Sequence, residues 1–322
     1  MKQLFAALAA LAVTAGISAQ TVKVDGSSTV YPITEGIAED FQKQTKIKTT
    51  VGISGTGGGF KKFCRGEIDV QNASRPILQK EMEDCAKAGV AYLELPVAFD
   101  ALTVVVSPRN DFVRQLTVDE LRRMWEPAAQ GKITNWNQIN PAFPNRPLKL
   151  FGAGSDSGTF DYFTEAVVGK SKSSRGDYTA SEDDNVLVTG VANEVGGIAY
   201  FGYAYYAENT KRLRPVSIVN RKGQAVAPSE QSVMDGSYNP LSRPIMIYVS
   251  AKSLERAEVR RFVEFYQRNA AKISKEVKYV PLPDRVYENN LKIVAAGRTG
   301  TIFGGHNEVG MTVDELVTRG VK

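Results

Sequence analysis

Between residues 22 and 88, short runs typical of β-strands alternate with longer runs typical of amphipathic helices. Strands are predicted at 22–25, 47–53 and 68–70, where β-branched residues gather. The first predicted helix carries Ile33, Ile37 and Phe41 on one face. Because strands joined by helices usually pair in parallel, this order predicts an α/β fold with mixed, mostly parallel sheets.

Two long apolar strands, predicted at 99–107 and 245–250, are candidates for crossings between two lobes. Residues 20–104 plus 248–322 would then form lobe 1, and residues 105–247 would form lobe 2, with the two strands as a hinge. The other predicted elements are helices at 116–125, 157–168, 254–271 and 286–295, a strand at 148–152, a glycine-rich aromatic segment at 196–205 and a polar surface loop at 171–184.

Residues 1–19 are typical of a secretory signal peptide, cut near Ala19. Lys2 precedes a small apolar run that ends at Ile17, and polar residues follow at once. A membrane anchor is the alternative, but the run falls short of the ~20 apolar residues that a spanning helix needs. We therefore expect a periplasmic or extracellular protein that is soluble after cleavage.

Export changes the interpretation of the two cysteines, Cys64 and Cys85. In an oxidising compartment a structural disulfide is the expected state of such a pair. A redox pair and two free buried thiols are the alternatives, although no CxxC motif supports redox chemistry.

The composition argues against several kinds of function. A single histidine among 322 residues, His306, argues against a His-rich metal site and most histidine-dependent catalysis. The net charge of +5 is small and scattered, which argues against a nucleic-acid tract. We expect no metal and no cofactor.

Three turns, each between a predicted strand and a predicted helix, have the composition of oxyanion receptors. Free N–H groups at a helix start attract anions, glycines let a ligand approach, and hydroxyls add donors. Ordinary helix capping is the alternative for the first turn, and a tight structural turn or a flexible loop is the alternative for the second. In the third turn, Asp161 complements the helix dipole whether or not it contacts a ligand. Their candidate ligands are Ser28 and Thr29 in the turn 25–32, Ser54 and Thr56 in 52–60, and Ser157, Gly158 and Thr159 in 154–161.

Arg75 lies in a fourth segment, 72–76, which follows the strand at 68–70. Ligands of α/β proteins bind outside the carboxyl ends of parallel strands, so these segments should meet at one edge. A planar guanidinium suits a tetrahedral oxyanion, although a surface salt bridge is the common fate of an arginine. Two lobes that close on a small anion would bury it among neutral donors.

Five segments spread along the chain carry a resemblance to a known family. They are, in order, GSSTVYP (26–32), SGTGGGFKKFC (54–64), NASRPI (72–77), SDSGTFDYF (155–163) and GGIAYFGYAY (196–205). They resemble the periplasmic phosphate-binding proteins of high-affinity phosphate ABC transporters. The resemblance implies a two-lobed type II periplasmic-binding fold, one bound phosphate and a membrane permease as partner. In the second turn it favours Ser54, with Thr56 as the alternative.

The chain departs from the family pattern at two positions. Many members have an acidic residue where Arg75 stands, to accept the proton of hydrogen phosphate, and an arginine where Ala153 stands. Asp161 and Asp156 are the candidate acceptors, and Asp161 is favoured although helix-start electrostatics explain it equally well. Without a certain acceptor, the residues alone leave phosphate and sulfate open, and the resemblance decides for phosphate.

The sequence therefore predicts a monomeric, non-enzymatic receptor that delivers inorganic phosphate to an ABC transporter. The alternatives are a receptor for sulfate or another tetrahedral oxyanion, an exported phosphatase or serine hydrolase, and a surface adhesin. A hydrolase triad would depend on His306, and no Gly-x-Ser-x-Gly elbow is present.

Overall fold

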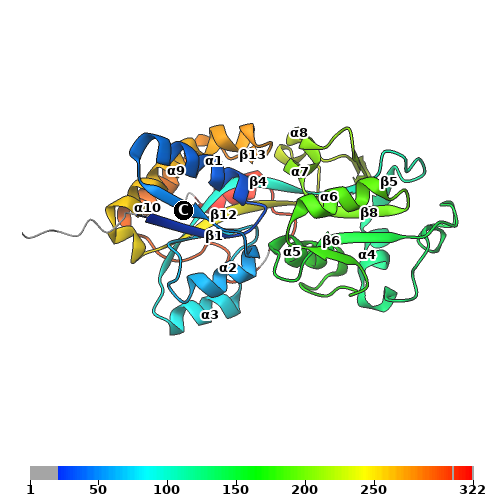
Figure 1. The fold of residues 1–322 in the computed structure, drawn as a ribbon, viewed down its shortest axis with the longest axis horizontal. Coiled ribbons are helices and arrows are strands. Elements are labelled where there is room, and N and C mark those ends of the chain that lie inside the picture. Colours follow the sequence, from blue (N-terminus) through cyan, green and yellow to red (C-terminus); the bar gives the residue numbers. More distant parts are fainter. Residues whose placement is uncertain (1–20, 307, 321–322) are drawn as a thin grey trace, which may run out of the picture.

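A computed structural model describes residues 21–306 and 308–320. The predicted signal peptide therefore lies outside the described residues. In the described chain no helix is both long and apolar enough to cross a membrane. Figure 1 shows two bodies side by side, the first lobe on the left and the second lobe on the right, joined by strands β4 and β12.

The first lobe begins with the predicted strand–helix alternation. Its three short strands are parallel, with β1 between the other two. The elements are β1 (Thr21–Gly26), α1 (Tyr31–Thr45), β2 (Lys48–Val51), α2 (Gly55–Phe63), β3 (Val70–Ala73) and α3 (Gln79–Lys87). The predicted face of the first helix, Ile33, Ile37 and Phe41, is buried. Removing each such side chain from water contributes about 1.5–3 kcal/mol to folding.

Two long antiparallel strands run from one lobe into the other. β4 spans Tyr92–Val106 and is buried throughout. It begins seven residues before the start of the strand predicted at 99–107. β12 spans Ser242–Ser250 and is also fully buried. The ten-stranded sheet has the order β2-β1-β3-β12-β4-β8-β6-β7, with β9 and β13 also paired to β4. This mixed α/β sheet confirms the predicted fold class.

The second lobe contains the segments between the crossing strands. Its elements are β5 (Gln115–Thr117), α4 (Val118–Trp125), η1 (Pro127–Ala129), η2 (Trp136–Gln138), β6 (Lys149–Ala153), α5 (Gly158–Val168), β7 (Thr179–Ser181), α6 (Asp184–Asn193), β8 (Gly197–Gly202), α7 (Tyr203–Glu208), β9 (Arg214–Pro215), β10 (Ser217–Val219), β11 (Ala225–Val226) and α8 (Glu230–Met234). The prediction of residues 171–184 as one surface loop is wrong. β7 pairs in parallel with β6, and Arg175 and Asp184 are buried.

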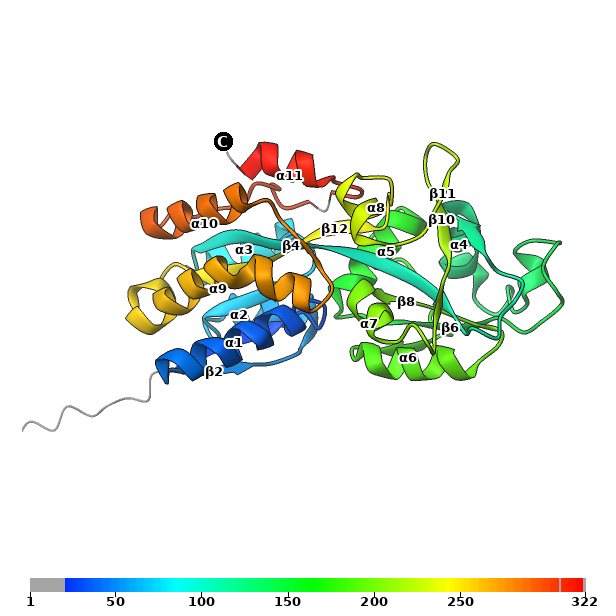
Figure 2. The same cartoon turned by 90° about the horizontal axis from the view of Figure 1, so that it is seen from above.

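The chain then returns to the first lobe, where helices cover the sheet (Figure 2). These elements are η3 (Ser253–Glu255), α9 (Ala257–Glu276), β13 (Val280–Pro281), α10 (Asp284–Ala296) and α11 (Val313–Gly320). α9 lies against α1 and α10, and the rings of Phe41 and Phe262 meet edge to face.

The predicted disulfide is present. It joins Cys64, which follows α2, to Cys85 within α3. The bond ties together two helices that flank one edge of the first lobe.

Candidate functional site between the lobes

The first hydroxyl-rich turn lies between β1 and α1, facing the second lobe. Ser28 and Thr29 are both buried there. The Oγ1 atom of Thr29 lies 3.1 Å from that of Thr159 across the cleft, and Tyr279 donates a hydrogen bond to the carbonyl oxygen of Thr29. α1 has no acidic residue in its first turn and no side-chain cap, so its positive end is not offset by its own side chains.

The glycine-rich turn brings Thr56, but not Ser54, into the interlobe contact. Thr56 is fully buried, and its Oγ1 lies 3.1 Å from Ser74 Oγ and accepts a hydrogen bond from Ser74 N–H. Ser54 is partly exposed and donates to Asp25 Oδ1. A Cβ on Gly55, whose φ is +73°, would lie 2.2 Å from the carbonyl oxygen of Asp156 in the other lobe. Close approach of the lobes thus requires glycine at this position.

The third turn opens α5 and packs directly against the hydroxyls of the first lobe. A Cβ on Gly158 would lie 2.4 Å from both Thr56 Oγ1 and Ser74 Oγ. Ser157 caps the helix by accepting a hydrogen bond from Thr159 N–H. The turn is held by aromatic packing, because Phe163 of α5 stacks on the buried ring of Tyr200 at 3.7 Å. Hydroxyls from both lobes therefore converge at one buried place.

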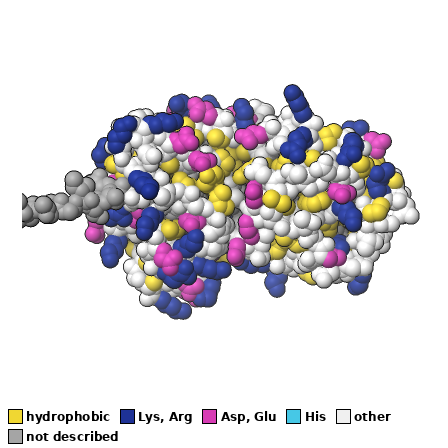
Figure 3. All heavy atoms as spheres, in the orientation of Figure 1, with side chains coloured by type: hydrophobic (Ala, Val, Ile, Leu, Met, Phe, Trp, Pro, Cys, Tyr) yellow, Lys and Arg dark blue, Asp and Glu magenta, His cyan; other side chains and the backbone are white. Residues whose placement is uncertain are grey.

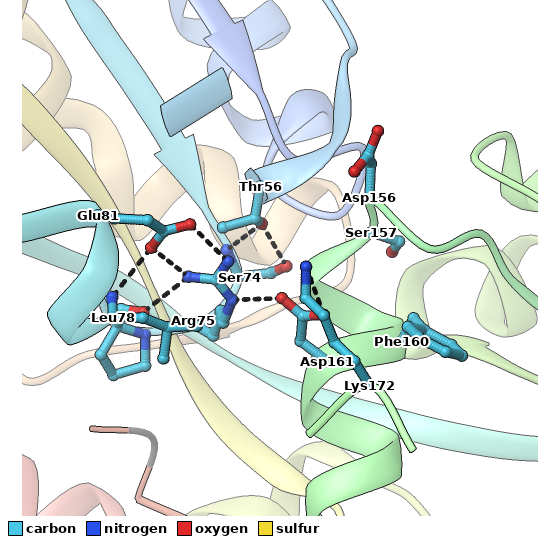
Figure 4. A network of polar contacts seen from close by, with 12 residues as sticks. Thr56, Ser74, Arg75, Leu78, Glu81, Asp156, Ser157, Phe160, Asp161 and Lys172 are labelled. Carbon is cyan, nitrogen blue, oxygen red and sulfur yellow. Dashed lines mark hydrogen bonds and ion pairs between the residues drawn. The ribbon is translucent and has the colours of Figure 1, made fainter. Parts of the chain in front are cut away.

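Arg75 is buried beside this place but is engaged by carboxylates (Figure 4). It forms two hydrogen bonds of 2.8 Å with Glu81, and its Nε donates to Asp161 Oδ2 at 2.6 Å. Burial opposes its charge, but Glu81 and Asp161 together raise the pKa of the guanidinium above its ordinary value. Asp161 belongs to the second lobe, so this buried ion pair joins the lobes. Lys172 adds a weaker contact, 3.8 Å from Asp161 Oδ1.

A second buried arginine, which the sequence analysis missed, touches the hydroxyls directly. Arg243 of β12 donates to Thr159 Oγ1 at 2.8 Å and to Thr29 Oγ1 at 3.3 Å. It also donates to the carbonyl oxygen of Gly158 and pairs with Asp100 on β4. β12 begins at Ser242, three residues before the strand predicted at 245–250, so Arg243 lies outside the predicted strand. An arginine within an otherwise apolar strand buried on both faces is the signal that would have identified it.

Burial favours the neutral form of two carboxyl groups beside the cleft. Burial raises the pKa of Asp100, against the lowering effect of Arg243. Burial, with the nearby charge of Asp100, raises the pKa of Asp184 to about 8, so this group holds its proton at neutral pH. Asp100 Oδ1 and Asp161 Oδ1 are buried without a hydrogen-bond partner in the described chain. A ligand that carries an O–H group could donate a hydrogen bond to either of these two oxygens.

Basic side chains gather outside the cleft. In Figure 3 they cover the lower part of the first lobe, where Figure 1 places α2 and α3. Lys61 of α2 and Lys80 of α3, together with Lys172, line a hollow of 530 Å³ that reaches Arg75. Lys61 also lies 3.5 Å from Asp156, which makes an exposed second ion pair between the lobes. Glu81, Asp84 and Asp156 line the same hollow, so its cations are balanced in part by carboxylates.

Fold and cleft together are those of a two-lobed binding protein with buried hydroxyls between its lobes. Comparison with known proteins supports this class: residues 12–270 match the model of the PBP superfamily domain. SphX from Synechococcus elongatus is 52% identical over 92% of this chain and 88% of that protein. The phosphate-binding protein PstS of Staphylococcus saprophyticus is 38% identical over 83% of this chain and 82% of that protein. The chain belongs to the PBP superfamily and, within it, to the family of PstS-like phosphate-binding proteins.

Solved structures agree with this assignment. A crystal structure of a possible phosphate-binding protein from Planctomyces limnophilus is 46% identical, with a TM-score of 0.65, over 86% of this chain and 98% of that one. A substrate-binding protein from Clostridium perfringens with bound phosphate has a TM-score of 0.69 over 82% of this chain and all of that one. At 23% identity it supports the fold alone, which is the type II periplasmic-binding fold expected from the resemblance.

Proposed function

We propose that this protein is an extracytoplasmic receptor that binds inorganic phosphate between its lobes and delivers it to the permease of an ABC transporter. The observation that carries the proposal is the convergence of Thr29, Thr56, Ser74 and Thr159, from both lobes, around Gly158. Hydroxyl and backbone N–H donors suit an oxyanion with several acceptor oxygens. The proposed role is binding and release, with the chain acting as a monomer.

The residues that we propose to bind phosphate are the predicted Ser28, Thr29, Thr56, Ser157, Gly158 and Thr159, together with Ser74. Thr56 replaces Ser54 in this set because Ser54 bonds to Asp25 instead. Arg75 is proposed to act through its ion pair with Asp161, since its donor groups already meet carboxylates.

Selection of phosphate over sulfate requires an acceptor for the phosphate proton, and we assign this role to Asp161. Arg75 holds one of its carboxylate oxygens, and the other is buried without a hydrogen-bond partner among the described residues. Asp156, the other candidate, has a half-exposed side chain. Near neutral pH sulfate has no proton to offer, so a carboxylate would repel it.

Calorimetric titration of the refolded mature chain, first stripped of ligand, tests the function. We expect one-to-one phosphate binding and no detectable heat with sulfate. Asp161→Asn should weaken phosphate binding and narrow the preference over sulfate. Equal binding of both anions by the unsubstituted chain would refute the proton-acceptor assignment, and binding of neither would refute the receptor function.

A further inference from the structure

Arg243 occupies an unusual position, because it lies on a strand that crosses between the lobes. Its register partner on the other crossing strand is Asp100, and both side chains are buried. Its Nε and Nη2 atoms donate to Asp100 Oδ2 at 3.3 and 3.1 Å. The same guanidinium therefore ties the crossing strands together and faces the site.

The remaining bonds of Arg243 reach one hydroxyl in each lobe. Nη2 donates to Thr159 Oγ1 and Thr29 Oγ1, and Nη1 donates to the carbonyl oxygen of Gly158. Because Nη2 also bonds to Asp100 and has two hydrogens, one of these hydrogens is shared between two acceptors. A guanidinium can only donate, so both hydroxyl oxygens accept from it. Their hydrogens must then point elsewhere. The two oxygens lie 3.1 Å apart, so only one hydrogen can serve the bond between them, and the other is left for a third group.

We propose that Arg243 is a positioning residue that turns the hydroxyl pair of Thr29 and Thr159 into a donor for the bound oxyanion. This inference rests on the proposed function. By donating to one lone pair of each hydroxyl oxygen, Arg243 directs the hydrogen that the Thr29–Thr159 bond does not use toward an acceptor oxygen of phosphate. Because one hydroxyl comes from each lobe, the arrangement is complete only when the lobes are closed.

The other buried arginine of the site has a different set of partners. Every bond of Arg75 recorded in the described chain goes to Glu81, Asp161 or the carbonyl oxygen of Pro76. No hydroxyl is among these partners, so Arg75 cannot orient Thr29 or Thr159. Asp100 balances the charge of Arg243, so the pair can be replaced by neutral groups without leaving a buried charge unpaired.

The test replaces this pair with amides of similar shape, in Arg243→Gln/Asp100→Asn, and measures phosphate affinity by calorimetry. We expect the dissociation constant to rise at least tenfold. Thr159→Val alone should also raise it, but adding Thr159→Val to the amide pair should raise it less than threefold further. Such non-additivity is the signature of a residue that acts through another, and a purely structural role would not produce it.

A matched control changes a partly buried pair outside the cleft, Arg256 with Asp69. Arg256→Gln/Asp69→Asn should lower the melting temperature while phosphate affinity stays within threefold. If the amide pair at Arg243 does not fold, Arg243→Lys serves instead. Its single ammonium keeps the charge beside Asp100 but cannot reach both hydroxyls and Gly158, so the same tenfold loss is expected.

Unchanged affinity in the folded variants, or losses that add fully with Thr159→Val, would overturn the inference while leaving the receptor function intact. Failure of the unsubstituted chain to bind phosphate would instead overturn the function and the inference together.

Discussion

At the scale of single residues, the glycine-rich turn separates two neighbouring hydroxyls by their partners. Thr56 faces Ser74 and Gly158 at the lobe interface, whereas Ser54 is held by Asp25. Although they are only two residues apart, Thr56 therefore faces the second lobe and Ser54 bonds within the first lobe.

Replacement of these residues should therefore have unequal effects. Thr56→Val removes a donor to a charged ligand, which is worth about 1.5–3 kcal/mol, or roughly ten- to a hundredfold in the dissociation constant. Ser54→Ala should leave phosphate affinity nearly unchanged. Calorimetry on both variants, with Thr56→Ser as the control that keeps a hydroxyl, decides the matter. A larger loss for Ser54→Ala would place Ser54 at the ligand.

A second residue-scale prediction concerns Glu94, which is buried away from the cleft. Tyr248, Thr301 and the Ile302 N–H donate to its carboxylate, yet burial raises its pKa from 4.5 to about 7. Between these values the folded chain binds more protons than the unfolded chain. Its contribution to stability is therefore complete below pH 4.5 and is lost as the pH rises through 7.

Glu94→Gln should remove this pH-dependent loss of folding stability. The loss amounts to about 3 kcal/mol for the rise in the pKa of Glu94 from 4.5 to about 7. Urea unfolding from pH 4.5 to 8 measures it: the free energy of unfolding should fall with pH less steeply in the variant. Glu67→Gln, at an exposed carboxylate paired with Arg65, is the control and should keep the original slope. Identical slopes for Glu94→Gln and the unsubstituted chain would contradict the raised pKa.

At the scale of elements, the disulfide fixes α3 against α2. α3 carries Glu81, whose carboxylate holds Arg75 and also accepts a hydrogen bond from the Leu78 N–H at the start of the helix. The disulfide thus supports the ion-pair cluster without touching the hydroxyls.

Cys64→Ser/Cys85→Ser should lower the free energy of unfolding by about 3 kcal/mol, because the unfolded chain loses a cross-link. Urea unfolding of the variant, compared with the unsubstituted chain before and after reduction, gives the value. The preference for phosphate over sulfate should persist. A switch in ligand preference would mean that the disulfide loop shapes the site.

Elements governed by local periodicity could be predicted from the sequence, and those governed by tertiary pairing could not. The first helix and the glycine-rich turn follow from spacing and from glycine chemistry. β7 does not, because residues 179–181 become a strand only by pairing with β6. The start of β4 does not either, because it is set by pairing with β12. Thr29, Thr56 and Thr159 could be predicted because each lies in a turn at a helix start. Ser74 was missed, although it lies in the segment that contains Arg75, and Arg243 joins the hydroxyls only through a strand from a distant part of the sequence.

At the scale of the whole molecule, two ion pairs among the described residues join the lobes, and they differ in how deeply they are buried. Arg75 and Asp161 are each 1% exposed, whereas the side chains of Lys61 and Asp156 are 66% and 49% exposed. Buried pairs are costly to break from one side, and exposed pairs contribute little.

Arg75→Ala should therefore leave Glu81 and Asp161 unpaired, favour the open state and raise the dissociation constant for phosphate at least tenfold, a conservative figure for breaking a buried pair. Lys61→Ala should change it less than threefold. Small-angle scattering adds a direct measure, since phosphate should compact the unsubstituted chain more than Arg75→Ala. Equal losses of phosphate affinity in Arg75→Ala and Lys61→Ala would contradict a role of the buried ion pair in closing the lobes.

The route of the chain has a mechanical consequence. Thr21 and α11, at the two ends of the described chain, both lie in the first lobe, and the second lobe is entered and left through the neighbouring strands β4 and β12. A force applied to either end of the described chain would act on the first lobe and would leave the second lobe free of tension. If one end of the molecule is attached to a surface or a bead, the second lobe should still be able to move relative to the first. Immobilisation should therefore not slow the binding of solute.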